Sequence, residues 1–247
     1  MPATRTPTRA TTDLWHAHLV TLSLPHRITH VLLDLDGTLT DSAPGIIASL
    51  RTGFADAGFA VPSDEALRTF VGPPLGSSLA RIGLSAADAA ATIAAYRRDF
   101  EVHGMFDNSV FEGVAEELAE LRAAGVMLLV ATAKPEHYAR RIVGHFGLEG
   151  YLAGGLDGVH GAGDYAGEVQ GKEVVVERAL AHAVALVADA GEVVMVGDRE
   201  HDVHAAAHHG VPTVGVTWGY AAPGELEAAG AAAIATTPRE LRKLLAS

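Results

Sequence analysis

Carboxylates gather at one point of this sequence, directly after an apolar run. The run from Ile28 to Leu33 is apolar at all but two positions, and Asp34-Leu35-Asp36-Gly37-Thr38 follows it. Such a run favours a buried strand. Asp34 and Asp36 are two residues apart, so an extended chain turns both side chains to the same side. Two carboxylates so placed repel each other unless a cation or a shared proton lies between them.

Three interpretations of this acidic tip can be compared. A calcium loop needs Gly at its sixth position and Glu at its twelfth, and counting from Asp34 those positions hold Leu39 and Gly45, which excludes it. A plain acidic turn after a strand remains open. The third interpretation is chemical: a nucleophilic aspartate, a second aspartate as acid and base, and a magnesium ion between them.

Composition limits the classes of protein. The 247 residues suffice for one large domain, or for a core with a smaller one. The formal net charge is −12 without a dense basic cluster, so we expect no nucleic-acid partner. Apolar runs fall well short of the roughly 18 residues of a membrane span, so no membrane partner is expected. Cysteine is absent, which excludes disulfides and is compatible with the expected cytoplasmic location.

The first 106 residues contain an extension and a helical insert. Residues 1–24 are rich in Thr, Pro and Arg, and we expect them to be loosely ordered. From 41 to 106 the periodicity is helical throughout, with Ser85 as the N-cap of an alanine-rich helix over 86–102. This stretch is too long for an ordinary loop, so it predicts an inserted helical cap.

From residue 107 onward, strands and helices alternate. Continuous apolar runs at 126–131 and 193–196 predict buried parallel strands, and further strands are expected at 212–216 and 231–235. A short strand is predicted near 151–156, and the glycine-rich stretch 154–171 is predicted to be a flexible loop. The fold class is therefore α/β: a doubly wound parallel sheet, with a Rossmann-like core over 25–40 and 107–247 and a small α-helical cap over 41–106.

Polar residues stand at the ends of three of these strands. They are Asp34 with Asp36, then Thr132, then Asp198, and Lys172 begins a predicted helix. Ligands of open α/β sheets bind at the carboxyl ends of strands. This ordered set resembles the four motifs of the haloacid dehalogenase superfamily of phosphotransferases, across nearly the whole chain after residue 28. The family often has proline after the lysine, whereas Glu173 follows here.

The resemblance implies a role for each motif residue. Asp34 would be the nucleophile that becomes an aspartyl phosphate. Asp36 would be the general acid for the leaving alcohol and then the base for water. Thr132 would donate its hydroxyl to the phosphoryl oxygens, and Lys172 would neutralise charge.

The same resemblance implies a Mg²⁺ cofactor. Asp34 and Asp198 would supply carboxylate ligands, Asp36 would bind through its backbone carbonyl, and Asp202 would support the site from the next helix. Oxygen ligands of this kind suit Mg²⁺.

Substrate contacts are expected from both parts of the chain. In the core they are Gly37, Thr38, Ala133 and Lys134, although surface exposure of Lys134 is an equal alternative. From the cap we expect Arg51 and Gly72 to face the leaving group, with a solvated helix position as the alternative for Arg51.

Further motifs narrow the resemblance to one branch of the superfamily. Val71-Gly72-Pro73-Pro74-Leu75 and Gly197-Asp198-Arg199-Glu200-His201-Asp202 resemble the phosphoglycolate phosphatase and 5′-nucleotidase-like branch. That implies a phosphatase, monomeric or homodimeric, acting on a small phosphorylated metabolite: phosphoglycolate, a nucleoside 5′-monophosphate or a natural-product sugar phosphate. A phosphomutase and a non-catalytic phospholigand-binding protein are the alternatives.

Three histidines suggest a second site. His201, His204 and His208 fall on one face of a predicted helix, but no further ligand spacing accompanies them. We therefore expect a solvated helix face.

Overall fold

A six-stranded parallel sheet forms the centre of the computed structural model, which describes residues 22–163, 171–186 and 192–246. The strand order is β5-β4-β1-β6-β7-β8. The strands are β1 (Ile28–Leu33), β4 (Met127–Pro135), β5 (Val159–Ala162), β6 (Glu192–Gly197), β7 (Thr213–Val216) and β8 (Ala233–Ala235). The predicted fold class is confirmed. Most of the N-terminal extension, 1–21, lies outside the described residues.

Helices cover both faces of the sheet, because alternate strand residues point to opposite sides. Val31 and Leu33 pack in one apolar cluster with α5 (Val114–Ala123), α6 (Glu136–His145) and α10 (Pro238–Leu245). Leu32 packs in a second cluster with α7 (Lys172–Leu186) and α8 (Glu200–His208). The short helix α9 (Glu225–Ala229) packs beside α8. No helix of the described residues is long and apolar enough to cross a bilayer.

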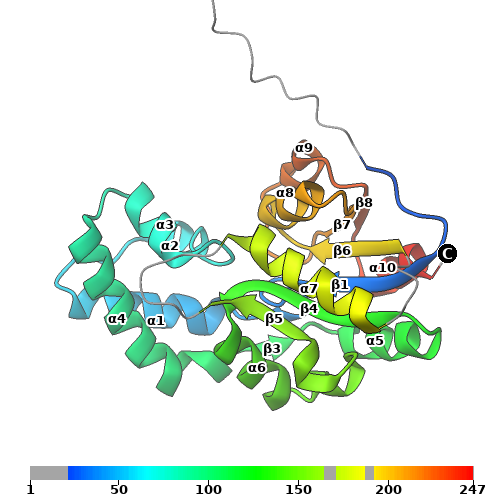
Figure 1. The fold of residues 1–247 in the computed structure, drawn as a ribbon. Coiled ribbons are helices and arrows are strands. Elements are labelled where there is room, and N and C mark those ends of the chain that lie inside the picture. Colours follow the sequence, from blue (N-terminus) through cyan, green and yellow to red (C-terminus); the bar gives the residue numbers. More distant parts are fainter. Residues whose placement is uncertain (1–21, 164–170, 187–191, 247) are drawn as a thin grey trace, which may run out of the picture.

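A group of helices lies beyond one end of the sheet (Figure 1). They are α1 (Ala43–Asp56), α2 (Asp64–Arg68), α3 (Leu75–Arg81) and α4 (Ala86–Val102), followed by the 3₁₀ turn η1 (Gly104–Phe106). The side chain of Ser85 accepts a hydrogen bond from the Asp88 amide, which confirms the predicted N-cap of α4. A two-stranded antiparallel ribbon, β2 (Thr40–Asp41) with β3 (Ser109–Val110), joins these helices to the core.

The edge strand β5 lies later in the chain than the sequence predicted. The predicted strand at 151–156 is wrong, because the 3₁₀ turns η2 (Leu148–Tyr151) and η3 (Gly155–Gly158) occupy that region. The strand begins at Val159 inside the stretch predicted as a flexible loop, and Val159 pairs with Val130. Its apolar content is only Val159 and Ala162, too little to signal a strand. The rest of that loop prediction, 164–170, lies outside the described residues.

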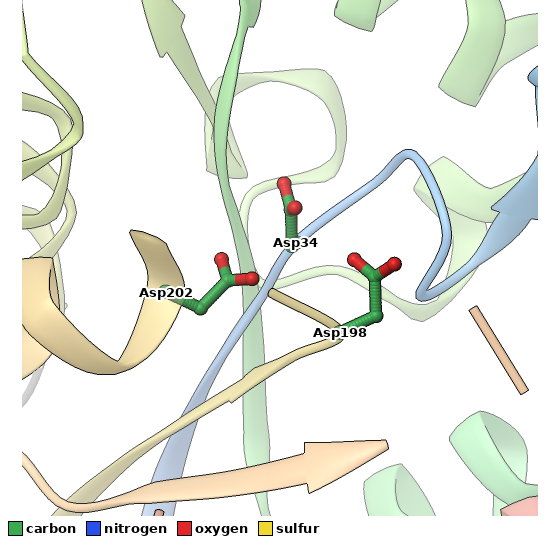
Figure 2. A group of neighbouring side chains, drawn as sticks. All are labelled: Asp34, Asp198 and Asp202. Carbon is green, nitrogen blue, oxygen red and sulfur yellow. The ribbon is translucent and has the colours of Figure 1, made fainter. Parts of the chain in front are cut away.

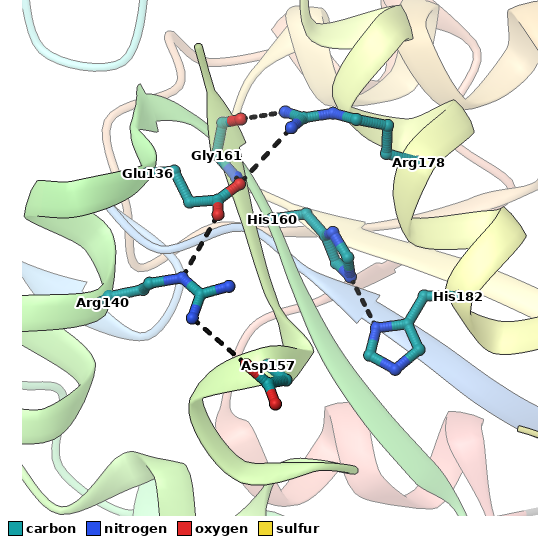
Figure 3. A network of polar contacts seen from close by, with 7 residues as sticks. All are labelled: Glu136, Arg140, Asp157, His160, Gly161, Arg178 and His182. Atoms are coloured by element: carbon teal, nitrogen blue, oxygen red, sulfur yellow. Dashed lines mark hydrogen bonds and ion pairs between the residues drawn. The ribbon is translucent and has the colours of Figure 1, made fainter. Parts of the chain in front are cut away.

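A polar network ties β5 to the neighbouring helices (Figure 3). The Gly161 amide donates to Glu136 Oε2 on α6 at 3.2 Å, and the Gly161 carbonyl accepts from Arg178 on α7. His160 and His182 share a hydrogen bond of 2.9 Å between ring nitrogens. These side chains supply partners for an edge strand whose backbone would otherwise be open on one side.

Candidate active site

The carboxyl ends of β1 and β6 bring three aspartates together (Figure 2). Asp34 directly follows β1, Asp198 directly follows β6, and Asp202 lies in the first turn of α8. One carboxylate oxygen from each lies within 4.8 Å of the others, and all three residues are buried. Strand ends predicted Asp34 and Asp198 at one edge of the sheet, because parallel strands share that edge, and the family resemblance implied Asp202 from the following helix.

Lys172 reaches this cluster from the start of α7. Its Nζ lies 2.9 Å from Asp34 Oδ2 and also pairs with Asp202 Oδ1. Burial opposes the lysine charge, but the carboxylates of Asp202 and Asp34 outweigh it and raise the pKa of Lys172. The lysine is therefore a fixed cation that balances part of the negative charge.

One lysine does not balance three carboxylates. Burial, with the neighbouring charges of Asp202 and Asp36 against the opposing charge of Lys172, raises the pKa of Asp34 to about 6. Burial and the charges of Asp202 and Asp34 raise the pKa of Asp198 well above its ordinary range. Among the described residues, Asp34 Oδ1 and Asp198 Oδ1 have no hydrogen-bond partner. Buried, unpartnered carboxylate oxygens with excess negative charge fit a hard divalent cation such as Mg²⁺.

Two glycines allow the chain to close around Asp198. At Gly37, where φ is +82°, an added Cβ would lie 2.2 Å from Asp198 Oδ2. At Gly219 it would lie 2.3 Å from the same oxygen. The backbone amide of Tyr220 donates to Asp198 Oδ2 at 2.6 Å. Any side chain at either glycine would displace the carboxylate.

The second motif carboxylate, Asp36, has its own cation. Lys134 Nζ lies 2.7 Å from Asp36 Oδ2, and its side chain is only 6% exposed. The alternative of a surface-exposed Lys134 is therefore wrong. The Lys134 amide donates to Thr132 Oγ1 at 3.3 Å, so Thr132 and Lys134 are held together at the tip of β4. Lys134 Nζ also lies 5.1 Å from the centre of the Phe100 ring in α4.

Two cavities open at the site and meet at Gly72, Pro74 and Ala133, which line both. The smaller, about 360 Å³, is lined by Asp34, Lys172 and Asp202. The larger, about 830 Å³, runs from Asp36 and Lys134 into the helical insert. Gly72 and Ala133 thus lie where substrate contacts were expected.

Two other residues that were expected to contact substrate, Thr38 and Arg51, are placed differently from Gly72 and Ala133. Thr38 is buried, with a hydroxyl that has no partner among the described residues. The structure does not bring Arg51 to the site: it pairs with Asp64 on the surface, its side chain is 47% exposed, and it lines neither cavity. Asp64 begins α2 close to α1, and this local acid captures the guanidinium.

The three histidines of α8 line the smaller cavity. His204 and His208 are exposed and His201 is half-buried, while the acidic cluster of the described residues includes none of them. The expected solvated face therefore holds for His204 and His208, and His201 is partly covered.

The sequence missed several residues around the site. The Tyr220 hydroxyl donates to Asp41 Oδ1 at 2.9 Å, and the Trp218 indole donates to the Thr38 carbonyl at 3.1 Å. Both follow β7, so applying the strand-tip rule to that strand would have found them. Arg199 donates to Glu225 Oε1 at 2.8 Å and to the Val71 carbonyl of the insert at 2.9 Å, and no local sequence signal marks this bridge.

The chain is similar to several known proteins. The family model described as haloacid dehalogenase-like hydrolase matches residues 31–216. The chain is 46% identical over 191 residues to the tyrosine-protein kinase PtkA of Mycobacterium tuberculosis, covering 77% of this chain and 62% of that protein's length. It is 35% identical over 204 residues to a 5′-nucleotidase of Pseudomonas aeruginosa. That match covers 82% of this chain and 88% of the nucleotidase. A crystal structure described as a predicted phosphatase from Clostridium acetobutylicum matches with a TM-score of 0.79 at 36% identity. That match covers 88% of this chain and 97% of the phosphatase chain.

Proposed function

Because this chain belongs to the haloacid dehalogenase-like hydrolase family, we propose that it is a Mg²⁺-dependent phosphomonoesterase acting on a small phosphorylated metabolite. The reaction passes through an aspartyl phosphate on Asp34. The observation that carries the proposal is the buried cluster of Asp34, Asp198 and Asp202 beside Lys172, with the separate pair of Asp36 and Lys134 next to it. Two carboxylates in different surroundings can take different roles in one reaction.

The first step breaks the ester bond. An oxygen of Asp34 attacks phosphorus, the bond from phosphorus to the ester oxygen breaks, and Asp36 gives its proton to the departing alkoxide. Lys172 holds Asp34 Oδ2 at 2.9 Å, which fixes the direction of the carboxylate before attack. The Thr132 hydroxyl and nearby amides donate to the phosphoryl oxygens.

The second step regenerates the enzyme. A water attacks phosphorus, Asp36 takes the proton from that water, and the bond between phosphorus and Asp34 breaks to release phosphate. Oxygens of Asp34, Asp198 and Asp202, with the Asp36 backbone carbonyl, would hold Mg²⁺, which supplies positive charge against the repulsion between carboxylate and phosphoryl oxygens.

The helical insert serves as a lid in this proposal. Residues 41–106 form the cap, and residues 25–40 and 107–247 form the core. The ribbon of β2 and β3 connects the two, so the cap can hinge there and exclude water from the site on closure. Gly37, Thr38 and Ala133 then surround the phosphoryl group, and Gly72 reaches it from the cap.

A phosphate-release screen over a panel of phosphometabolites, with Mg²⁺, Ca²⁺ or chelator, tests this function. We expect release only with Mg²⁺, because Ca²⁺ takes more ligands at longer distances and spoils in-line attack. Asp34→Asn should lower kcat by at least about 10³-fold while the protein stays folded. The exposed Asp64→Asn is the matched control and should retain activity. Full activity in excess chelator, or Asp34→Asn activity within tenfold of the native protein, would contradict the assignment.

The same assay separates the alternatives. A phosphomutase would return an isomerised sugar phosphate, and a phospholigand-binding protein would release nothing from any ester. The 46% identity to a protein named as a tyrosine kinase favours one more candidate, in which a tyrosine hydroxyl replaces water as the phosphoryl acceptor. Transfer of radiolabelled phosphate from ATP to tyrosine, without phosphate release from the panel, would favour that function.

A further inference from the structure

The larger cavity extends the proposed active site into the cap. It begins at Asp36 and Lys134, passes the turn at Gly72, and continues between α1, α3 and α4. Its volume is about 830 Å³. Pockets of roughly 300–1,000 Å³ hold ligands of drug size. The cavity is therefore much larger than a two-carbon acid needs.

The walls of this cavity are mostly apolar. Aliphatic and aromatic side chains of the cap supply them, including Ile46, Leu50, Phe70, Leu75, Leu84 and Ile93. Three charged residues of the described chain line it. Asp36 and Lys134 pair with each other at the core end, and Arg97 lies exposed on α4. A carboxylate or sugar buried among these walls would leave polar groups without partners, which costs free energy.

Aromatic rings stand next to the reacting end. Phe100 stacks on Tyr96 with ring centres 5.3 Å apart and meets Tyr138 edge-on at 5.5 Å. The Tyr138 hydroxyl already donates to Glu101. Lys134 lies between Phe100 and Asp36, at 5.1 Å from the ring centre and 2.7 Å from the carboxylate oxygen. The aromatic cluster is thus one side chain away from the proposed general acid, where the first carbons of a leaving group would lie.

We propose that this cavity binds the leaving group of the substrate, and that this group is an apolar, ring-bearing alcohol. The inference rests on the proposed phosphomonoesterase function and names its substrate class. A ring in the cavity packs against partly exposed aliphatic walls such as Leu75, Leu84 and Ile93, while the phosphoryl group lies at Asp34 and Lys172. A short hydroxy acid would fill little of this space.

Kinetics on 2-phenylethyl phosphate and ethyl phosphate test the inference. Both release a primary alkoxide, so the chemical step is alike and the difference reports binding of the ring. Burial of one phenyl group predicts a kcat/KM at least about 30-fold higher for 2-phenylethyl phosphate. The kcat/KM for phosphoglycolate should be similar to that for ethyl phosphate. Equal values for the first pair, or a preference for phosphoglycolate, would overturn the inference.

A variant pair localises the effect. Ile93→Gln puts an amide in the cavity wall, and Val102→Gln makes a comparable change on the same helix at a side chain that is 72% exposed. We expect Ile93→Gln to lower kcat/KM for 2-phenylethyl phosphate about tenfold and to change that for ethyl phosphate less than twofold. Val102→Gln should alter neither. Equal losses on both esters for Ile93→Gln would remove this wall from the substrate site.

Binding without turnover separates this inference from the proposed function. Calorimetry with Mg²⁺ compares 2-phenylethylphosphonate with ethylphosphonate, neither of which has an ester oxygen to leave. Tighter binding of the phenyl compound by at least about 30-fold supports an apolar cavity even if no ester is hydrolysed, in which case only the phosphatase function fails. Equal binding contradicts the inference, whether or not phosphate is released.

Discussion

At the scale of single residues, the main feature of the site is an excess of buried negative charge. Asp34, Asp198 and Asp202 are buried within reach of one another, and Lys172 is their direct cation. Removing one partner from a buried ion pair leaves uncompensated charge, which is strongly destabilising. The lysine and a divalent cation at the same carboxylates can each relieve that charge. They differ in where they act, because the lysine holds Asp34 Oδ2 and leaves Asp34 Oδ1 for another partner.

This difference gives a prediction for Lys172→Met. The variant should lose on the order of 3 kcal/mol of unfolding free energy in chelator, because Asp34 and Asp202 then lose the cation that they share inside the cluster. Mg²⁺ should restore most of that stability through binding to the native state. Phosphate release should stay at least about 10²-fold below the native rate in either condition. Chemical denaturation with and without Mg²⁺, beside kinetics, measures both quantities.

Lys243→Met is the matched control, since Lys243 is exposed on the last helix. It should change neither stability nor rate. If Mg²⁺ restored the activity of Lys172→Met together with its stability, the lysine would act only as a counter-charge. The orienting role given to it above would then be wrong.

At the scale of elements, Arg199 joins three parts of the fold. It follows Asp198, donates from its side chain to Glu225 at the start of α9, and reaches the Val71 carbonyl beside the Gly72 turn of the cap. One guanidinium therefore connects the loop that carries a proposed metal ligand to the insert that covers the site. We infer that Arg199 is a positioning residue for the cap.

Arg199→Lys tests that inference. Lysine keeps the charge but lacks the planar fork, so one of the two contacts is lost. Loss of about one hydrogen bond to a charged group should lower kcat/KM about tenfold, mainly through KM. The stabilisation of the protein by Mg²⁺ should not change. Arg98→Lys is the control, because Arg98 is exposed on α4 and lies 3.9 Å from Asp56. A loss of Mg²⁺ stabilisation in Arg199→Lys would instead assign the arginine to the metal loop alone.

The sequence predicted those features of the fold and site whose signal lies in a short stretch of neighbouring residues. Buried parallel strands are rich in apolar residues, so β1, β4, β6 and β7 were predicted, and the polar ends of the first three predicted Asp34, Thr132 and Asp198. Strand β5 has little apolar content and depends on Glu136 and Arg178 from other elements, so no local pattern showed it. The sequence left Arg51 open between a substrate contact and a solvated helix position for a related reason, because its partner Asp64 lies on a different helix.

At the scale of the whole molecule, one half-buried histidine, His160, links stability to pH. Burial, followed by the charges of His182, Arg178 and Arg140 against that of Glu136, lowers the pKa of His160 from 6.5 to about 4. Between these values the unfolded chain binds a proton that the folded chain does not. Stability contributed by neutral His160 is therefore fully present above pH 6.5 and falls as pH drops toward 4.

We expect His160→Asn to flatten this pH dependence. The full linkage between pH 6.5 and 5 is about 2 kcal/mol, and partial exposure of His160 reduces it to roughly 1 kcal/mol. Urea denaturation at pH 7, 6 and 5 should show a smaller fall in unfolding free energy for His160→Asn than for the native protein. The exposed His204→Asn should match the native slope. Parallel slopes for all three proteins would show that His160 does not carry the effect.

The ribbon of β2 and β3 has a consequence for how such molecules diversify. Thr40 pairs with Val110 and Asp41 with Ser109, so the chain leaves the core and returns to it at adjacent positions. Paired antiparallel residues lie about 5 Å apart, a gap that an ordinary hairpin turn closes. We expect that the segment between the two strands can be exchanged for one from a relative, or shortened to a turn, without unfolding the sheet. New substrate ranges could then arise by recombination at this ribbon, while the aspartates and lysine are inherited unchanged.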